Sequence, residues 1–244
     1  MTRARGFTLI EMAIVLVIIT ILIGGLAMPL SAQIQARRIA ETRTDMNAIR
    51  EAIIGYAMRQ PAGKPYLPCP DDGTGLAEGD EGIRDAGRCL HTRGKLPWRT
   101  LGVDNADAWG NRYTYAVTRD FTNDRSVIPV NTGFDSNTSG DLEVHKDQNC
   151  SGGGVAHQVA VVVVSHGPNG RGAQNKNGGT PLAPAQVPAS ERANLVVPTA
   201  PCTDKDFVSP TPLDNDFDDL IVWLHPNTLK NRLCQNGCPL NSPP

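Results

Sequence analysis

The first 68 residues contain no cysteine, and all six cysteines lie in the later part of the chain. Aromatic residues are scarce at 5% of the sequence, whereas Gly and Pro are abundant, with 24 and 19 copies. This composition predicts a domain with a modest core and long loops. Lys and Arg (23) nearly balance Asp and Glu (25), so the composition gives no indication of a nucleic-acid partner.

Motifs that would nominate a catalytic residue are also absent. The sequence contains neither HExxH nor GxSxG, and its five histidines are scattered. The glycine-rich stretch 165–179, SHGPNGRGAQNKNGG, lacks the Gly-Lys-Ser/Thr ending of a phosphate-binding loop, and we interpret it as a mobile surface loop. No enzymatic activity is predicted.

The N-terminus holds one long apolar run, from Phe7 to Leu30, in which Glu11 is the only ionisable residue. A helix of this length can cross ~30 Å of hydrocarbon. Arg3 and Arg5 precede the run, which places the N-terminus in the cytoplasm and the rest of the chain outside. The sequence therefore predicts a single-pass membrane segment over residues 7–30.

Two other interpretations of this run compete. A cleaved secretory signal would end near Ser31-Ala32, but the run is long for a signal and a discarded peptide has no use for a carboxylate. A plain membrane anchor is disfavoured by Glu11, because an ionised carboxylate in the bilayer costs at least a few kcal/mol and is usually retained for a partner.

The residues around Glu11 resemble a known processing site. Gly6 followed by FTLIE, with a short basic leader before it and an apolar run after it, resembles the N-terminus of type IV prepilins and type II secretion pseudopilins. The resemblance implies that residues 1–6 are a leader that prepilin peptidase removes between Gly6 and Phe7, and that Phe7 is then N-methylated. It also implies that Glu11 pairs with the new Phe7 ammonium of a neighbouring subunit and sets the register of assembly.

Residues 31–60 continue as an amphipathic helix, because Ile39, Met46, Ile49, Ile53 and Tyr56 recur at helical spacing. We expect positions 46–57 to contact the chain's own head.

Residues 61–244 form that predicted head. Strands are expected at 112–118, 158–165 and 219–225, and more weakly at 126–130 and 193–198. Strands after one long helix, without helical crossovers, predict a pilin-like α+β fold whose mainly antiparallel sheet packs on the helix.

In an exported head the cysteines are expected to form disulfides. The candidates are Cys69, Cys89, Cys150, Cys202, Cys234 and Cys238. Cys69 and Cys89 bracket an acidic, Gly-rich loop, and Cys234 and Cys238 enclose an Asn-Gly turn, which would leave Cys150 with Cys202. Fifteen connectivities stay open. Zinc is disfavoured, because the CxxC pairs that it often uses are absent.

An acidic stretch before the last predicted strand offers oxygen ligands. Asp216, Asp218 and Asp219 are calcium candidates on ligand type, although the glycine and the distal Glu of an EF-hand are missing. Residues 165–170 loosely resemble a sequence near the calcium site of pseudopilins, with Asn169 in place of the acid. A solvated acidic turn is the alternative, and no other cofactor is predicted.

The predicted function is a structural subunit, either a minor pilin or a pseudopilin. Its expected partners are other subunits, prepilin peptidase, an inner-membrane assembly platform and membrane lipid, with a periplasmic or extracellular filament as its final location. The alternative is a membrane-anchored periplasmic enzyme or ligand-binding protein that uses a pilin-like anchor.

Overall fold

The structure is a computed structural model that describes residues 8–60, 65–124, 134–135, 137–151, 153–179, 181, 183–210 and 217–233, the side chains at 23–30 and 184 excepted. The chain divides into two compact units, Met1–Glu41 and Thr42–Pro244. One helix, α1 (Leu9–Met58), contributes to both units.

The final part of α1 belongs to the second unit and buries an apolar stripe. Met46, Ile49, Ile53 and Tyr56 are all buried there, as their helical spacing predicts. Ile39, the first residue of the predicted stripe, is only partly buried. The core contact predicted for 46–57 is therefore confirmed.

Four strands form the larger sheet, in the order β3-β4-β7-β9 with every pair antiparallel. They are β3 (Arg93–Lys95), β4 (Thr114–Val117), β7 (Val161–Ser165) and β9 (Leu220–Leu224). Two of the strong strand predictions, 112–118 and 219–225, are found as β4 and β9. Met46 of α1 and Leu220 of β9 line one shared groove, which places the helix beside this sheet.

The predicted strand at 158–165 is two strands. Residues 158 and 159 are the last two residues of β6 (Gly154–Val159), and residues 161–165 form β7. Ala160 lies between the two strands. Gln158 has a left-handed φ of 51°, so the chain turns sharply there, although the apolar residues continue in the sequence. β6 pairs with β5 (Leu142–His145), which also pairs with β8 (Asp206–Val208) to give the order β6-β5-β8. The β5–β8 pair is parallel.

The core of the head lies between the two sheets. Val162 and Val164 of β7 pack with Val144 of β5 and Phe207 of β8, all fully buried. Arg93 of β3 also reaches the second sheet, where its guanidinium stacks 4.1 Å from the centroid of the Phe207 ring.

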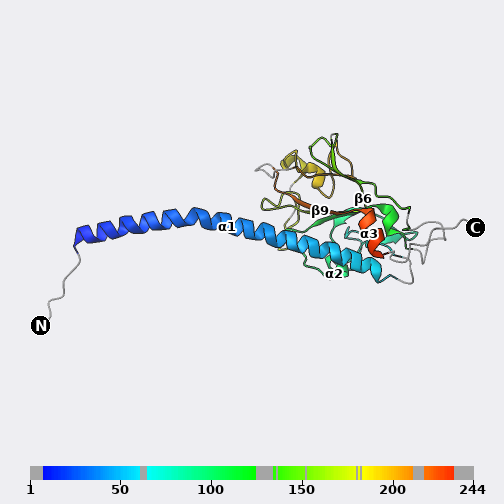
Figure 1. The fold of residues 1–244 in the computed structure, drawn as a ribbon, viewed down its shortest axis with the longest axis horizontal. Coiled ribbons are helices and arrows are strands. Elements are labelled where there is room, and N and C mark those ends of the chain that lie inside the picture. Colours follow the sequence, from blue (N-terminus) through cyan, green and yellow to red (C-terminus); the bar gives the residue numbers. More distant parts are fainter. Residues whose placement is uncertain are drawn as a thin grey trace, which may run out of the picture. The chain divides into compact units, whose positions relative to one another are not determined.

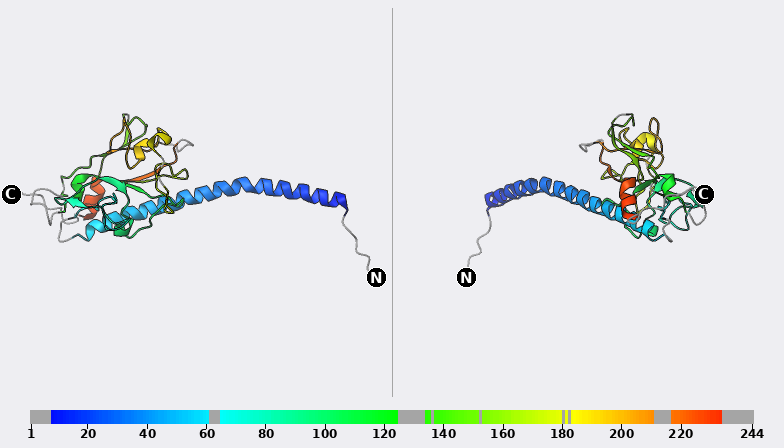
Figure 2. Two further views of the ribbon diagram at one scale, coloured as in Figure 1. Left: turned by 180° about the vertical axis from the view of Figure 1, so that it is seen from behind. Right: turned by 45° about the vertical axis from the view of Figure 1, so that its right-hand side comes forward.

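Short elements complete the described fold. They are β1 (Arg84–Asp85), β2 (Arg88–Cys89), α2 (Trp98–Leu101), the 3₁₀ helices η1 (Arg119–Thr122), η2 (Pro184–Gln186) and η3 (Arg192–Asn194), and α3 (Pro226–Leu233). Figures 1 and 2 show α3 beside the last turns of α1, where Arg232 donates to Glu51. The weak strand prediction at 193–198 is wrong, because η3 occupies its start; that at 126–130 lies outside the described residues.

Two disulfides join segments of the described head. Cys69 pairs with Cys89, and Cys150 pairs with Cys202. These are the pairs that their sequence context suggested. Cys234 and Cys238 lie outside the described residues.

Candidate functional site

The N-terminal motif is described from Thr8 onward, so Gly6 and Phe7 lie outside the described residues. Glu11 forms a capping box with Thr8 at the start of α1. Its Oε2 accepts from the Thr8 backbone N–H at 2.7 Å and from the Thr8 hydroxyl at 2.9 Å. The Thr8 Oγ1 in turn accepts from the Glu11 N–H at 3.3 Å. The Thr-x-x-Glu spacing is the sequence signal of this cap.

The first turns of α1 expose apolar side chains on every side. All side chains from Leu9 to Leu22 are solvent-exposed in the isolated chain, and Leu9 is 89% exposed. A helix that is apolar all round requires apolar neighbours. Among the side chains that the structure describes, no helix combines the length and the apolar character needed to cross a membrane.

A second candidate lies in the head, where three carboxylates meet. Potential ligand atoms of Glu191, Asp218 and Asp219 all lie within 4.8 Å of one another. Glu191 immediately precedes η3, and the two aspartates immediately precede β9. Asn169, from the segment after β7, donates its side-chain N–H to Glu191 Oε1 at 2.9 Å and its backbone N–H to Asp218 Oδ2 at 3.0 Å.

Among the residues that the structure describes, each of these carboxylates keeps one buried oxygen without a hydrogen-bond partner, namely Glu191 Oε2, Asp218 Oδ1 and Asp219 Oδ1. Burial raises the pKa of Glu191 to about 7 and also raises the pKa of Asp218 and of Asp219. Neighbouring carboxylates add to the rise in pKa at Glu191 and at Asp219. A bound cation would favour the ionised form of these three acids and would take their free oxygens as ligands. The group therefore suits a cation that prefers oxygen ligands.

The segment from Ser165 to Gly170 holds this group together. In the stretch 165–179, which was predicted to be a surface loop, Ser165, His166 and Gly167 are buried, whereas residues 168–179 are exposed or partly buried. Gly167 has φ +56°, and a Cβ there would lie 2.4 Å from the Asp218 carbonyl oxygen, so only glycine permits this approach. The segment is therefore fitted against Asp218.

The calcium candidates are thus partly placed. Asp218 and Asp219 lie together, and Asp216 lies outside the described residues. Glu191 was not predicted, because it stands 27 residues before Asp218 in an irregular stretch without a motif. Asn169 stands where the resembling sequence has an acid, and it donates hydrogen bonds to Glu191 and Asp218.

A buried line of side chains next to this group does not form a catalytic triad. Thr114 Oγ1 lies 2.8 Å from His166 Nε2, but His166 Nδ1 is 3.7 Å from Asp219 Oδ1, beyond hydrogen-bond distance. Burial lowers the pKa of His166 to about 4, with the Arg93 charge adding to the effect. A base this weak is poorly matched to proton transfer near neutral pH.

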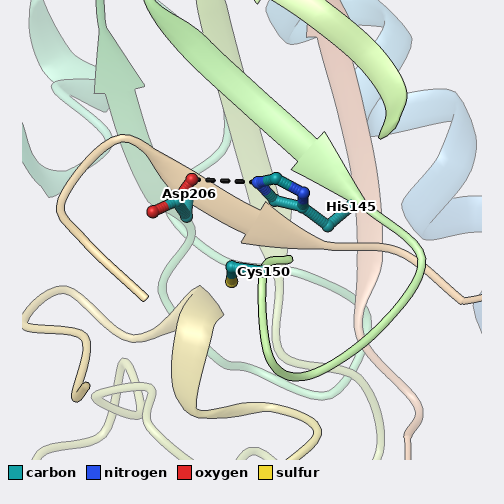
Figure 3. A group of neighbouring side chains, drawn as sticks. All are labelled: His145, Cys150 and Asp206. Carbon is teal, nitrogen blue, oxygen red and sulfur yellow. Dashed lines mark hydrogen bonds and ion pairs between the residues drawn. The ribbon is translucent and has the colours of Figure 1, made fainter. Parts of the chain in front are cut away.

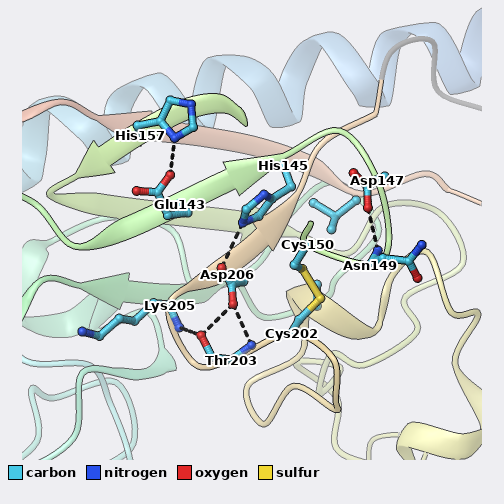
Figure 4. Close-up of polar contacts among 12 residues, drawn as sticks. Glu143, His145, Asp147, Asn149, Cys150, His157, Cys202, Thr203, Lys205 and Asp206 are labelled. Carbon is cyan, nitrogen blue, oxygen red and sulfur yellow. Dashed lines mark hydrogen bonds and ion pairs between the residues drawn. A yellow bond between two sulfur atoms is a disulfide. The ribbon is translucent and has the colours of Figure 1, made fainter. Parts of the chain in front are cut away.

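A third group lies at one end of the smaller sheet. Figure 3 shows His145, Cys150 and Asp206 around one point, with ligand atoms within 4.8 Å of one another. Figure 4 shows that the Cys150 sulfur is bonded to Cys202, so it carries no thiolate in this state. On the same sheet His157 Nδ1 lies 2.5 Å from Glu143 Oε2.

Comparison with known proteins bears on the N-terminal site. Residues 1–27 match the family model described as the prokaryotic N-terminal methylation motif. The chain therefore carries a prepilin-type motif, which indicates a prepilin-like substrate of type IV pilus or type II secretion systems. No curated protein and no solved structure matches the chain.

Proposed function

We propose that the chain is a pilin-like structural subunit, a minor pilin or a pseudopilin. Prepilin peptidase removes residues 1–6, Phe7 is N-methylated, and residues 7–30 hold the subunit in the inner membrane until an assembly platform moves it into a filament. Residues 31–60 continue the helix, and residues 61–244 form the head outside the cytoplasmic membrane.

The methylation-motif match is the observation that carries this proposal. Two structural features support it. The exposed apolar side chains of Leu9 to Leu22 need other helices or lipid around them. Within the described part of the chain, the Glu11 carboxylate accepts hydrogen bonds from Thr8, at the start of the same helix, and it can exchange them for the ammonium that cleavage creates on Phe7.

The structure of the head supports the proposed minor-subunit role. Its described part carries two disulfides and, beyond the sheet that adjoins α1, a three-stranded sheet and the two-stranded pair β1-β2. A head with this much loop structure suits a subunit at a filament tip better than one repeated along the shaft, where every head must pack on identical neighbours.

Mass spectrometry of the mature N-terminus tests the processing step. We expect the protein purified from its native membrane or filament to begin at Phe7 with one added methyl group. The same cells without prepilin peptidase should retain residues 1–6. A mature protein that begins at Gln33 would contradict the proposal, because a secretory signal would then account for the apolar run.

We also propose that the head binds calcium at Glu191, Asp218 and Asp219. The buried oxygens left without hydrogen bonds favour this, and the oxygen-only donor set fits a hard cation. Bound calcium would neutralise the carboxylates and tie the start of β9 to the segment before η3.

Thermal unfolding of the full chain in detergent measures this binding. Calcium at a hundredfold excess over its Kd is expected to stabilise the head by about 2.7 kcal/mol relative to EDTA. For a domain of this size that raises the Tm by roughly 5–10 °C.

Variants separate the site from general ion effects. Glu191→Gln and Asp218→Asn should fold but lose the calcium-dependent Tm shift. Asp141→Asn removes an exposed acid that pairs with Lys205 outside this group, and should keep the shift. An equal shift in all three variants, or none in the native chain, would refute the calcium site.

A further inference from the structure

The Cys150–Cys202 disulfide lies beside His145 and Asp206, two side chains of types that can ligate metals. His145 ends β5, Asp206 begins β8, and Cys150 and Cys202 lie in the segments next to these strands. The His145 Nε2 lies 2.9 Å from Asp206 Oδ1. Parallel pairing of β5 with β8, in which His145 is opposite Val208, brings these segments together across more than fifty residues of sequence.

The Asp206 carboxylate is held in a fixed orientation. Its Oδ2 accepts from the Thr203 N–H at 2.8 Å and from the Thr203 hydroxyl at 2.6 Å, which directs Oδ1 to His145 (Figure 4). Outer hydrogen bonds of this kind orient the ligands of protein metal sites. The side chains of His145 and Asp206 are 12% and 17% exposed, so a small ion can reach them.

Four donors are therefore gathered at one place. The ligand atoms of His145, Cys150 and Asp206 lie within 4.8 Å of one another, and the Cys202 sulfur is bonded to that of Cys150. Ligands of a tetrahedral zinc site are separated by about 3.3–3.8 Å, given bond lengths of about 2.0–2.3 Å. Small side-chain movements would bring the four donors to that spacing once the sulfurs separate.

The disulfide itself prevents this arrangement, because bonded sulfurs are too close and carry no thiolate charge. A dithiol reductant can open it. The reductant transfers two electrons and two protons, its own thiols join as a disulfide, and Cys150 and Cys202 become free thiols. A divalent ion that binds both sulfurs then displaces their two protons to solvent.

We propose that His145, Cys150, Cys202 and Asp206 form a tetrahedral site for zinc-class ions in the reduced chain, and that the disulfide and the bound metal are alternative states of the same four side chains. The sequence did not predict this site, because its two cysteines are 52 residues apart and do not form a CxxC pair. The metal state protects the thiols until the head is oxidised. This inference does not depend on the proposed filament function.

The Cys69–Cys89 disulfide serves as a control within the same molecule. Cys69 and Cys89 belong to no group of three or more metal-ligating side chains among the described residues. Zinc should therefore affect the two cysteine pairs of the same molecule differently.

Reoxidation kinetics use this difference without any variant. The full chain is reduced in detergent with a water-soluble phosphine, desalted, and reoxidised with glutathione disulfide with or without equimolar zinc. Alkylation and mass spectrometry follow each pair. We expect zinc to slow closure of Cys150–Cys202 at least tenfold and to leave Cys69–Cys89 unchanged. Equal effects on both pairs, or no effect on either, would overturn the proposal.

Cobalt titration of the reduced chain identifies the ligands. Tetrahedral thiolate-bound cobalt has strong visible and near-ultraviolet absorption, which should develop in the reduced chain and be absent from the oxidised chain. His145→Ala and Asp206→Asn should weaken binding at least tenfold, whereas His157→Ala, on the same sheet but outside the group, should bind as the native chain does. Native-like binding by the first two variants would refute the assigned ligands.

Discussion

Replacing Glu11 with alanine is expected to reduce incorporation into filaments more than a hundredfold, while the head still folds. The physical reason is the Phe7 ammonium of the mature subunit, which loses its carboxylate partner in an apolar filament core. An unpaired buried charge costs roughly 3–5 kcal/mol. Filaments sheared from cells and probed for the subunit measure the incorporated fraction, and membrane fractions measure the stored precursor.

Two variants sharpen this test. Glu41→Ala removes an exposed acid of the same helix outside the apolar run and should assemble normally. Glu11→Gln can still accept the Thr8 hydrogen bonds but carries no charge, and should fail like alanine. Assembly of Glu11→Gln at the native level would mean that the cap, and not the ion pair, is the important contact, and would contradict the proposed role of Glu11.

Replacing Arg93 with methionine is expected to destabilise the head by about 3 kcal/mol, since three backbone acceptors would lose their donor. The Arg93 guanidinium donates to the carbonyl oxygens of Asp204 at 3.1 Å and Asp206 at 3.2 Å, and also to that of Ala193. Burial lowers the pKa of Arg93 to about 9, which reflects the cost of holding this cation inside. That cost offsets part of the gain and keeps the expected loss moderate.

Thermal unfolding followed by tryptophan fluorescence measures the effect, with an expected fall in Tm of roughly 6–12 °C. Arg99→Ala is the matched control, because that guanidinium is 49% exposed and lies 3.7 Å from Asp80, and it should change stability by no more than about 0.5 kcal/mol. Equal Tm values for the native chain and the Arg93→Met variant would contradict this prediction and would show that apolar packing holds the sheets together without the Arg93 hydrogen bonds.

Local sequence patterns predicted the elements whose structure depends on residues close together in the chain. The stripe from Met46 to Tyr56 gave the buried face of α1 because helical geometry fixes spacing along one element. Strands β4 and β9 followed from local apolar runs. The sharp turn at Gln158 escaped prediction, since a continuous apolar run from Val159 to Val164 fits one strand as well as two.

Contacts between distant segments could not be read from the sequence. Glu191 reaches Asp218 and Asp219 only because η3 packs near the start of β9, and no local motif marks it. His145 and Asp206 meet only because β5 and β8 run parallel. Such pairings depend on the whole fold, whereas the Thr8–Glu11 cap was visible in four residues and was overlooked beside the more conspicuous glutamate.

The parallel pairing of β5 with β8 has a consequence for the order in which the head forms. β5 cannot complete its sheet until residue 206 has left the ribosome, and β7 waits still longer for β9 at Leu220. Long-range pairings slow folding and leave strand edges open in the meantime. Nascent chains of this protein should therefore stay sensitive to proteases until synthesis is nearly finished, and then become resistant in one late step.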